Sequence, residues 1–188
     1  MKQIKYDRLG LVGRFRPLHL GGAKLLESVC NSAQHVVIGI GSCNPESYGY
    51  RNPFTANEAE DMIREYSSGR FSNYEIVHVP DFGHIPKYRD GQKWVEHIVD
   101  NFGSLDGFVS GNDYVKNLLE DHYTIIHPKD IIPKDELIES KGSIVRLMMA
   151  KGDLGWRHMV PTEVGLYLVE NNLVERFRKE FGEETIEH

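Results

Sequence analysis

The sequence has few cysteines, no long hydrophobic run and no excess of positive charge. Cys30 and Cys43 are the two thiols in 188 residues, too few for a disulfide framework, and no C-x-x-C pair suggests a zinc site. No apolar stretch reaches the ~18 residues that a membrane helix needs. The charged segment 1–8 lacks the pattern of a signal peptide. We therefore expect a reduced, cytoplasmic protein with no membrane partner.

The charge balance limits the class of partner further. The chain has 28 acidic and 22 basic side chains, giving a net formal charge of −6. Because general nucleic-acid binding depends on neutralising phosphates, we expect no nucleic-acid partner, although a local basic cluster could hold a nucleotide. With 40% hydrophobic residues, the chain can bury one sizeable core. We expect a single domain over residues 1–188, with a helical C-terminal part from about residue 143.

Short apolar strands alternate with helical segments along the chain. Strands are predicted at Leu9–Val12, His35–Ile40, Ile76–Val79, Gly107–Val109 and Tyr123–Ile126. Helices are predicted at Leu20–Cys30, Ala56–Ser67, Gln92–Phe102, Val115–Leu119, Ser143–Lys151, Pro161–Asn171 and Leu173–Phe181, with Thr55 and Glu58 forming a capping box. This alternation predicts an α/β fold with a Rossmann-like, doubly wound parallel sheet of five to six strands and helices on both faces. Ligands of such sheets lie beyond the carboxyl ends of the strands.

The segment after the first predicted strand has the composition of a phosphate loop. Gly13–Gly22 reads GRFRPLHLGG, which places two arginines, a histidine and three glycines before a helix. A helix N-terminus offers backbone N–H groups and positive potential to an anion, and Arg14 and Arg16 can donate in pairs to phosphate oxygens. The chain has no G-x-x-x-x-G-K-[ST] motif, and GIGSCN at Gly39–Asn44 lacks the third glycine of a dinucleotide fingerprint.

GRFRPLHLGG resembles the G-x-F-x-P-x-H-x-G-H signature of the HxGH nucleotidyltransferases. The closer resemblance is to the archaeal-type nicotinamide-mononucleotide adenylyltransferases, and it runs from about Leu9 to Phe181. It is carried by VVIGIGS followed by RNPFTANE, by SGND at Ser110–Asp113, by KGSIVR at Lys141–Arg146, and by GDLGWRHMVP…VERFRK near the end. The order and spacing of these segments make the resemblance specific.

The resemblance implies an enzyme that joins ATP and nicotinamide mononucleotide to give NAD and pyrophosphate. The phosphate of the mononucleotide is the nucleophile, so catalysis is positioning and charge stabilisation. Mg²⁺ would be carried mainly by the ATP phosphates, since it keeps its waters, and no protein ligand for it is named. The family often assembles, so a homo-oligomer is expected.

The resemblance also implies roles for particular residues. His19, Arg14, Arg51 and Arg146 would act at the phosphates, and Trp94 would stack on the nicotinamide ring. Read from the sequence alone, Trp94 fits a core position and Arg51 and Arg146 fit surface charges, so these three roles depend on the family pattern. The remaining ATP-site residues would be Gly13, Phe15, Arg16, Gly21, Gly22, Lys141 and Ser143, with Gly111 and Asn112 beside the adenosine; Ser42, Phe54 and Asp81 would bind the acceptor.

The chain departs from the family pattern at several of these positions. Gly22 replaces the second histidine of the motif, Arg16 replaces a common Gln, and Lys141 and Ile144 replace the usual Ser and Glu. One hypothesis is that Arg16 or Lys141 supplies the missing charge and adenylyl transfer survives. Another is a diverged nucleotide-binding protein with weak or no catalysis, and a third is transfer to a different phosphorylated acceptor. Residues 128–140 are either a loop over the site or a plain connector.

Overall fold

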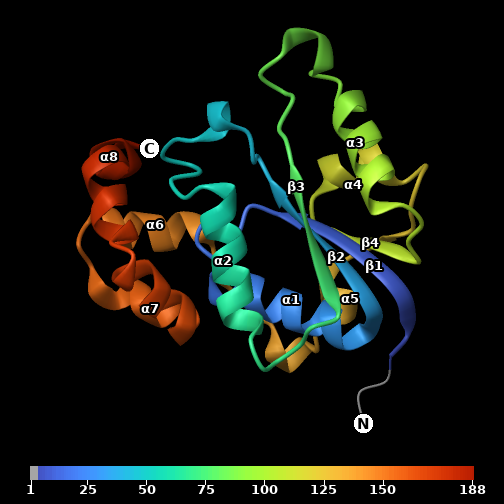
Figure 1. Cartoon of the computed structure of the whole chain (residues 1–188), viewed down its shortest axis with the longest axis horizontal. Coiled ribbons are helices and arrows are strands. Elements are labelled where there is room, and N and C mark those ends of the chain that lie inside the picture. The colour runs from blue at the N-terminus through green and yellow to red at the C-terminus, as the bar shows by residue number, and fades with distance from the viewer. Residues whose placement is uncertain (1–3) are drawn as a thin grey trace.

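The computed structural model describes residues 4–188 and contains a five-stranded parallel sheet in the order β3-β2-β1-β4-β5 (Figure 1). The chain winds outward from β1 through β2 to β3, and then returns to the other side of β1 with β4. The reversal places a crevice beyond the carboxyl ends of β1 and β4. The predicted Rossmann-like α/β fold is therefore confirmed, with strands β1 Tyr6–Gly13, β2 Ala33–Gly41, β3 Tyr74–Val79, β4 Gly107–Val109 and β5 Ile125–Ile126.

Helices cover both faces of the sheet, and each face has its own apolar cluster. Successive side chains of a strand point to opposite faces; Val36 and Ile38 of β2 belong to one cluster, and Val37 between them belongs to the other. The first cluster also contains residues of α1, α2 and the C-terminal helices, and the second contains residues of α3 and α4. The helices are α1 Leu20–Ser32, α2 Ala56–Ser67, α3 Gln92–Phe102, α4 Asp113–Leu119, α5 Pro128–Ile131, α6 Gly142–Ala150, α7 Thr162–Glu170 and α8 Leu173–Glu187.

Two glycines allow α3 to pack closely on the sheet. A Cβ added at Gly10 would lie 2.9 Å from the Phe102 ring, and one added at Gly39 would also lie 2.9 Å from it. Phe102 itself is fully buried. The absence of side chains at these strand positions therefore makes room for Phe102, the largest fully buried residue of α3.

Most predicted elements are found, and the differences concern their ends. The capping box is confirmed: Glu58 N donates to Thr55 Oγ1 at 3.2 Å, and Thr55 N donates to Glu58 Oε2 at 2.8 Å. Tyr123 lies outside β5, because its backbone N–H donates to the Leu119 carbonyl at the end of α4, at 2.9 Å. Pro161 precedes α7 as its N-cap with ψ 148°, so the helix begins one residue later than predicted.

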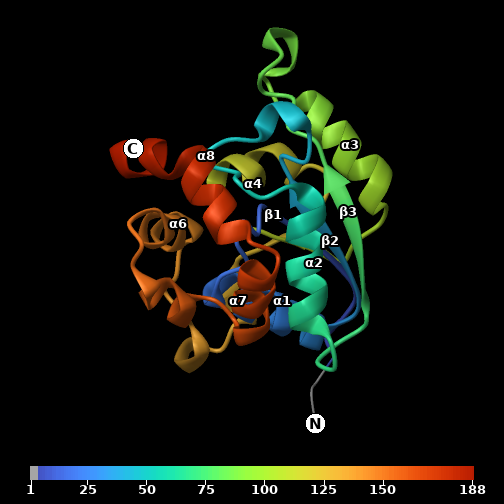
Figure 2. The same cartoon turned by 60° about the vertical axis from the view of Figure 1, so that its left-hand side comes forward.

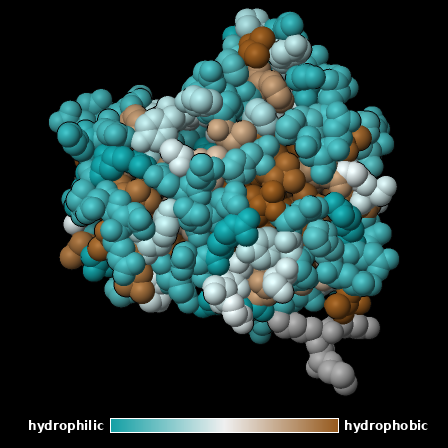
Figure 3. All heavy atoms as spheres, viewed as in Figure 1, coloured by the Kyte–Doolittle hydropathy of each residue, from teal (hydrophilic) through white to brown (hydrophobic). Residues whose placement is uncertain are grey.

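Helices α6, α7 and α8 gather at one side of the sheet, and Figures 1 and 2 agree on this arrangement. α6 packs mainly against α8, and α7 against α2. The face drawn in Figure 3 is mostly hydrophilic, with apolar side chains near its middle, over the part of the sheet that holds β3. Within residues 4–188, no helix is both long and apolar enough to cross a membrane.

Candidate active site

Two hollows open at the carboxyl end of β1 and meet at Gly13 and Arg14. We call the first the phosphate hollow; it has a volume of ≈ 510 Å³ and is lined by the loop after β1, the start of α6 and residues between them. We call the second the aromatic hollow; it has a volume of ≈ 380 Å³ and is lined by the segments that follow β2, β3 and β4. Both lie at the reversal point of the sheet, where the fold predicts ligand binding.

Two helices begin at the phosphate hollow. α1 begins after His19, whose Nδ1 accepts from Gly22 N at 3.3 Å. α6 begins after Lys141, which makes no side-chain capping bond, and its first turn contains no acidic residue. Lys141 and Ser143 both line the hollow. Because the first N–H groups of a helix lack partners within it, and because the helix dipole is positive there, this convergence favours an anion.

His19 is held in one tautomer. Since Nδ1 accepts the Gly22 N–H, the proton of the neutral ring lies on Nε2, which is free to donate. Burial lowers the pKa of His19, and the nearby positive charge of Arg146 lowers it further. The ring is therefore neutral near pH 7 and can act as a hydrogen-bond donor to a phosphate oxygen.

One partly buried and one buried arginine, Arg146 and Arg16, line the same hollow. Arg146 Nη1 donates to the Arg16 carbonyl at 2.8 Å, and burial together with the charges of Arg14 and Arg51 lowers the pKa of Arg146 to about 10. Burial likewise lowers the pKa of Arg16 to about 10, and Arg16 Nη1 donates to the Ser42 carbonyl at 2.9 Å. Both pKa values leave the side chains cationic near pH 7.

The arginines of this region form no ion pair within residues 4–188. Among the residues that the structure describes, Arg14, Arg16, Arg51 and Arg146 form no ion pair, whereas four arginines elsewhere each pair with a glutamate: Arg8 with Glu75, Arg64 with Glu60, Arg70 with Glu163 and Arg176 with Glu58. Arg16 is buried and Arg146 is partly buried, and burying a charge without a partner is costly. A bound polyanion would supply the missing counter-charge.

The loop glycines differ in how much space they leave. A Cβ at Gly21 would lie 2.9 Å from the Ile138 carbonyl oxygen, so the close approach of residues 138–140 requires glycine there. At Gly22 the nearest atom would be Leu18 Cδ1 at 3.4 Å, which leaves room for a side chain. Phe15, with φ 52°, folds its ring back over Gly13.

Residues 128–140 form one wall of the phosphate hollow. Pro128, Ile132, Ile138 and Ser140 line it, and the segment contains α5 together with a short 3₁₀ turn at Lys134–Glu136. Lys24 of α1 forms an ion pair with Glu136. The segment thus contributes apolar surface to the site and is more than a connector.

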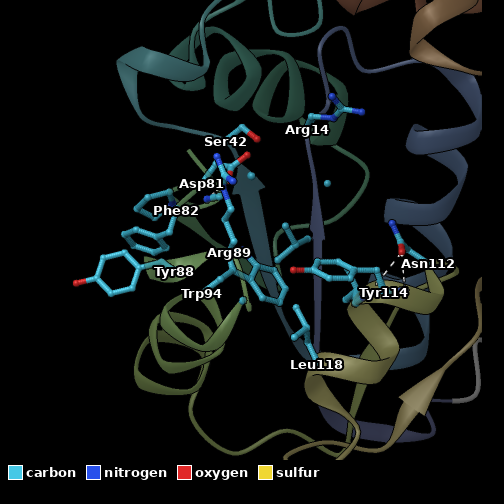
Figure 4. A pocket seen from close by; sticks show the side chains of 17 residues that line it. Arg14, Ser42, Asp81, Phe82, Tyr88, Arg89, Trp94, Asn112, Tyr114 and Leu118 are labelled. Carbon is cyan, nitrogen blue, oxygen red and sulfur yellow. Dashed lines mark hydrogen bonds between the residues drawn. The ribbon is translucent and has the colours of Figure 1, made fainter. Parts of the chain in front are cut away.

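The aromatic hollow presents flat rings around an opening. Trp94 of α3 faces the interior, with Tyr88 and Phe82 on one side and Tyr114 on the other (Figure 4). Asp81 lies at the rim; its Oδ1 accepts from Gly83 N and its own N donates to Asn44 Oδ1, each at 2.8 Å. Planar rings with a few polar groups suit a flat aromatic ligand with a polar substituent.

A third hollow extends the cationic region outward. We call it the outer hollow; its volume is ≈ 700 Å³, and Arg14, Arg51, Arg146 and Lys151 line it together with the end of α8. Arg14, Ser143 and Arg146 line the phosphate hollow as well. Arg51 therefore reaches the site from the outer side.

The structure brings most of the predicted site residues together. The phosphate hollow is lined by Gly13, Arg14, Phe15, Arg16, His19, Gly21, Gly22, Lys141, Ser143 and Arg146. The aromatic hollow contains Ser42, Asp81 and Trp94 as expected.

Three predicted residues lie elsewhere than expected. Phe54 is fully buried, and its ring centroid lies 6.1 Å from that of Phe177. Because the C-terminal helices cover Phe54, its side chain reaches neither the phosphate hollow nor the aromatic hollow. Asn112 lines the aromatic hollow and caps α4, its Oδ1 accepting from Tyr114 N at 2.9 Å. Gly111 lies near His127 and Pro128 without lining either hollow.

Sequence reasoning missed most of the lining of the aromatic hollow, including its other aromatic side chains, Phe82, Tyr88 and Tyr114, and also Arg89. All four lie in or just after the segments that follow β3 and β4, and the concentration of aromatic residues there was the available signal. In residues 4–188, no group of three or more His, Cys, Asp or Glu side chains could hold a metal ion.

The sequence matches the cytidylyltransferase-like family over residues 11–155. It is 32% identical to a nicotinamide-nucleotide adenylyltransferase of Aeropyrum pernix over 92% of this chain and 96% of that protein, and 30% identical to that of Thermoplasma volcanium over 95% of each. The fold is similar to a bifunctional NMN adenylyltransferase/ADP ribose pyrophosphatase from Francisella tularensis, with a TM-score of 0.71, 17% identity and 93% coverage of this chain. This chain spans 53% of that bifunctional protein.

Proposed function

The chain belongs to the cytidylyltransferase-like family, and we propose that it is a nicotinamide-nucleotide adenylyltransferase, an enzyme that converts ATP and nicotinamide mononucleotide to NAD and pyrophosphate. One observation carries this proposal. A hollow lined by unpaired arginines and a hollow lined by aromatic rings meet at Arg14. The first fits a triphosphate and the second fits a pyridine ring, so the two substrates would approach each other at the junction.

The reaction needs no side-chain nucleophile. A phosphate oxygen of the mononucleotide forms a bond to the α-phosphorus of ATP, the bond from that phosphorus to the bridging oxygen of the β-phosphate breaks, and pyrophosphate leaves with the electron pair. Arg14, at the junction, would neutralise charge on the reacting phosphates. His19 Nε2 and Arg146 would stabilise charge on the triphosphate.

ATP-dependent enzymes of this class work with a divalent metal ion, and we propose Mg²⁺ bound to the ATP phosphates. The residues around the phosphate hollow fit the anion rather than the ion, since they are arginines, a lysine and a neutral histidine. A metal held by phosphate oxygens and water needs no protein carboxylate. When bound, the ion would add positive charge at the phosphates.

The structure separates the two residues considered as replacements for the missing histidine. Arg16 is 4% exposed, and its guanidinium donates to the Ser42 main chain. Lys141 is exposed at the start of α6 and lines the hollow. Lys141 is therefore the better placed to supply charge to a triphosphate.

The test is to incubate the protein with ATP, Mg²⁺ and nicotinamide mononucleotide and to measure NAD and pyrophosphate, with a Gly22→His variant alongside. Equal amounts of both products from the parent support the proposal. Product from Gly22→His alone would indicate a diverged nucleotide-binding protein, and product from neither would exclude this acceptor. Competition with nicotinate mononucleotide distinguishes the nearest alternative acceptor.

A further inference from the structure

The loop that carries Arg51, residues 42–55 between β2 and α2, is attached to α8 ahead of Arg51. The Tyr48 hydroxyl donates to Glu180 Oε2 at 2.5 Å. The Tyr48 ring also meets Phe181 edge to face, with 5.1 Å between the ring centroids. Both partners belong to α8, so this part of the loop cannot move without breaking contacts to that helix.

The same loop is attached to α8 beyond Arg51. Arg176 Nη2 donates to the Pro53 carbonyl at 3.2 Å, and the Arg176 guanidinium donates to both carboxylate oxygens of Glu58 at 2.6 and 2.7 Å. A two-pronged arginine–carboxylate pair fixes orientation as well as distance. The short stretch around Arg51 therefore lies between two segments that are each held by contacts to α8.

Within that stretch, Tyr50 is the residue that contacts the Arg51 side chain. Arg51 Nε donates to the Tyr50 hydroxyl at 3.0 Å, and the guanidinium carbon lies 5.5 Å from the centroid of the Tyr50 ring. On its other side the Tyr50 ring stacks on His188, with centroids 5.1 Å apart and planes 26° apart. Tyr50 is therefore itself held in place.

The contact between the Tyr50 hydroxyl and Arg51 affects how Arg51 can bind phosphate. Arg51 is exposed, and fixing an exposed arginine on a ligand costs side-chain entropy. A hydroxyl that accepts from Nε limits the side-chain orientations while leaving both terminal nitrogens of the guanidinium available for phosphate oxygens. Arg51 and Tyr50 both line the outer hollow beside Arg146.

We propose that Tyr50, supported by His188, is a positioning residue that holds the Arg51 guanidinium toward the phosphates of the nucleotide. The inference rests on the proposed function for the identity of that nucleotide, ATP. It assigns Tyr50 no contact with the reacting atoms, and its effect acts through Arg51.

The experiment is a double-mutant cycle on Mg-ATP binding, measured by calorimetry without the second substrate. Tyr50→Phe keeps the ring and removes the hydroxyl that accepts from Arg51. We expect Mg-ATP binding to weaken about three- to tenfold, the size of one lost hydrogen bond. In an Arg51→Ala background, Tyr50→Phe should cause no further loss, because the group that it positions is absent.

Tyr167→Phe is the matched control. Its hydroxyl donates to Asp61 Oδ2 at 2.8 Å, away from the three hollows, so Mg-ATP binding should not change. If Tyr50→Phe weakens binding equally with and without Arg51, the tyrosine acts on the fold as a whole and the inference is overturned. It is also overturned if Tyr50→Phe binds like the parent.

His188 provides a second test of the same arrangement. His188→Phe retains a ring to stack on Tyr50 and should bind Mg-ATP like the parent, whereas His188→Ala should weaken binding, again only when Arg51 is present. Equal binding by both variants would remove His188 from the proposal.

Failure of this inference can be told apart from failure of the proposed function. Coupling between Tyr50 and Arg51 in Mg-ATP binding, with no NAD formed, would refute the proposed reaction and uphold the positioning role. NAD formation without coupling would do the reverse. No Mg-ATP binding by the parent would refute both.

Discussion

The phosphate hollow and the aromatic hollow share one edge of the sheet but are built from opposite kinds of side chain. The phosphate hollow holds a neutral histidine and arginines, from exposed Arg14 to buried Arg16, that form no ion pair within residues 4–188. The aromatic hollow holds several aromatic rings and a single carboxylate, Asp81. The same fold position therefore provides two recognition chemistries, one electrostatic and one based on stacking. Arg14 lines both and is the natural place for the two substrates to react.

The largest effect is expected from removing a cation of the phosphate hollow. Arg146→Ala should lower kcat/KM about 10²–10³-fold, the usual loss for one preorganised charged donor, and should leave the KM for nicotinamide mononucleotide nearly unchanged. Steady-state NAD formation measures both constants. Arg64→Ala is the control, because Arg64 pairs with Glu60 on the solvent-facing side of α2, and it should retain parental kinetics. A rise in the KM for the mononucleotide alone would contradict the division between the hollows.

The matching change in the aromatic hollow is Trp94→Ala. Loss of one stacking partner is worth about 1–3 kcal/mol, so the KM for nicotinamide mononucleotide should rise about five- to hundredfold while the KM for ATP stays close to the parental value. Trp94→Phe keeps an aromatic face and should recover most of the loss. Equal increases in both KM values would show that the hollows do not act separately.

A smaller effect is expected from restoring the motif histidine. A Cβ at Gly22 meets no atom closer than 3.4 Å, so Gly22→His should fold normally and add one donor to the phosphate hollow. A hydrogen bond to a charged group is usually worth about 1.5–3 kcal/mol. Because other cations are already present in the hollow, the gain should be at the low end of this range, and we expect kcat/KM for ATP to rise by about tenfold or less. In a Lys141→Ala background, Gly22→His should raise kcat/KM for ATP by a larger factor than it does in the parent. A smaller factor in that background would contradict compensation by Lys141.

The smallest effect concerns pH. The pKa of His19 is lowered below its ordinary 6.5, mainly by burial. As pH falls below that value, the unfolded chain takes up a proton at His19 before the folded protein does, so the free energy of unfolding should fall. His19→Asn should show a shallower fall. Urea unfolding at pH 7.5 and 5.5 measures the difference, and parallel pH dependence in the two proteins would contradict the burial of a neutral ring.

The two hollows were not equally predictable from the sequence. The composition of GRFRPLHLGG identifies the phosphate loop, because glycines, arginines and a helix start occur together within ten residues. The parallel α/β architecture followed from the alternation of strands and helices, whereas the order of the strands came from the structure. Arg146 is 130 residues from Arg16, whose carbonyl it contacts, and only the family pattern connected the two.

The aromatic hollow depends on distant packing that no local pattern shows. Tyr88 and Tyr114 come from segments after different strands, β3 and β4, and they line the same hollow on opposite sides of Trp94. Phe54 was expected in the site from the family resemblance, but its ring packs against Phe177. Phe54 lies on the side of the loop that α8 covers, and it therefore packs in the core.

The separation of the two hollows is tested most directly by intrinsic tryptophan fluorescence. Trp156 is 1% exposed among the C-terminal helices, whereas Trp94 faces the aromatic hollow. Titration with nicotinamide mononucleotide alone should quench the fluorescence of the parent and leave that of Trp94→Phe unchanged, and Mg-ATP alone should quench neither protein. Quenching that persists in Trp94→Phe, or no quenching of the parent at saturating mononucleotide, would contradict the assignment of this hollow to the pyridine ring.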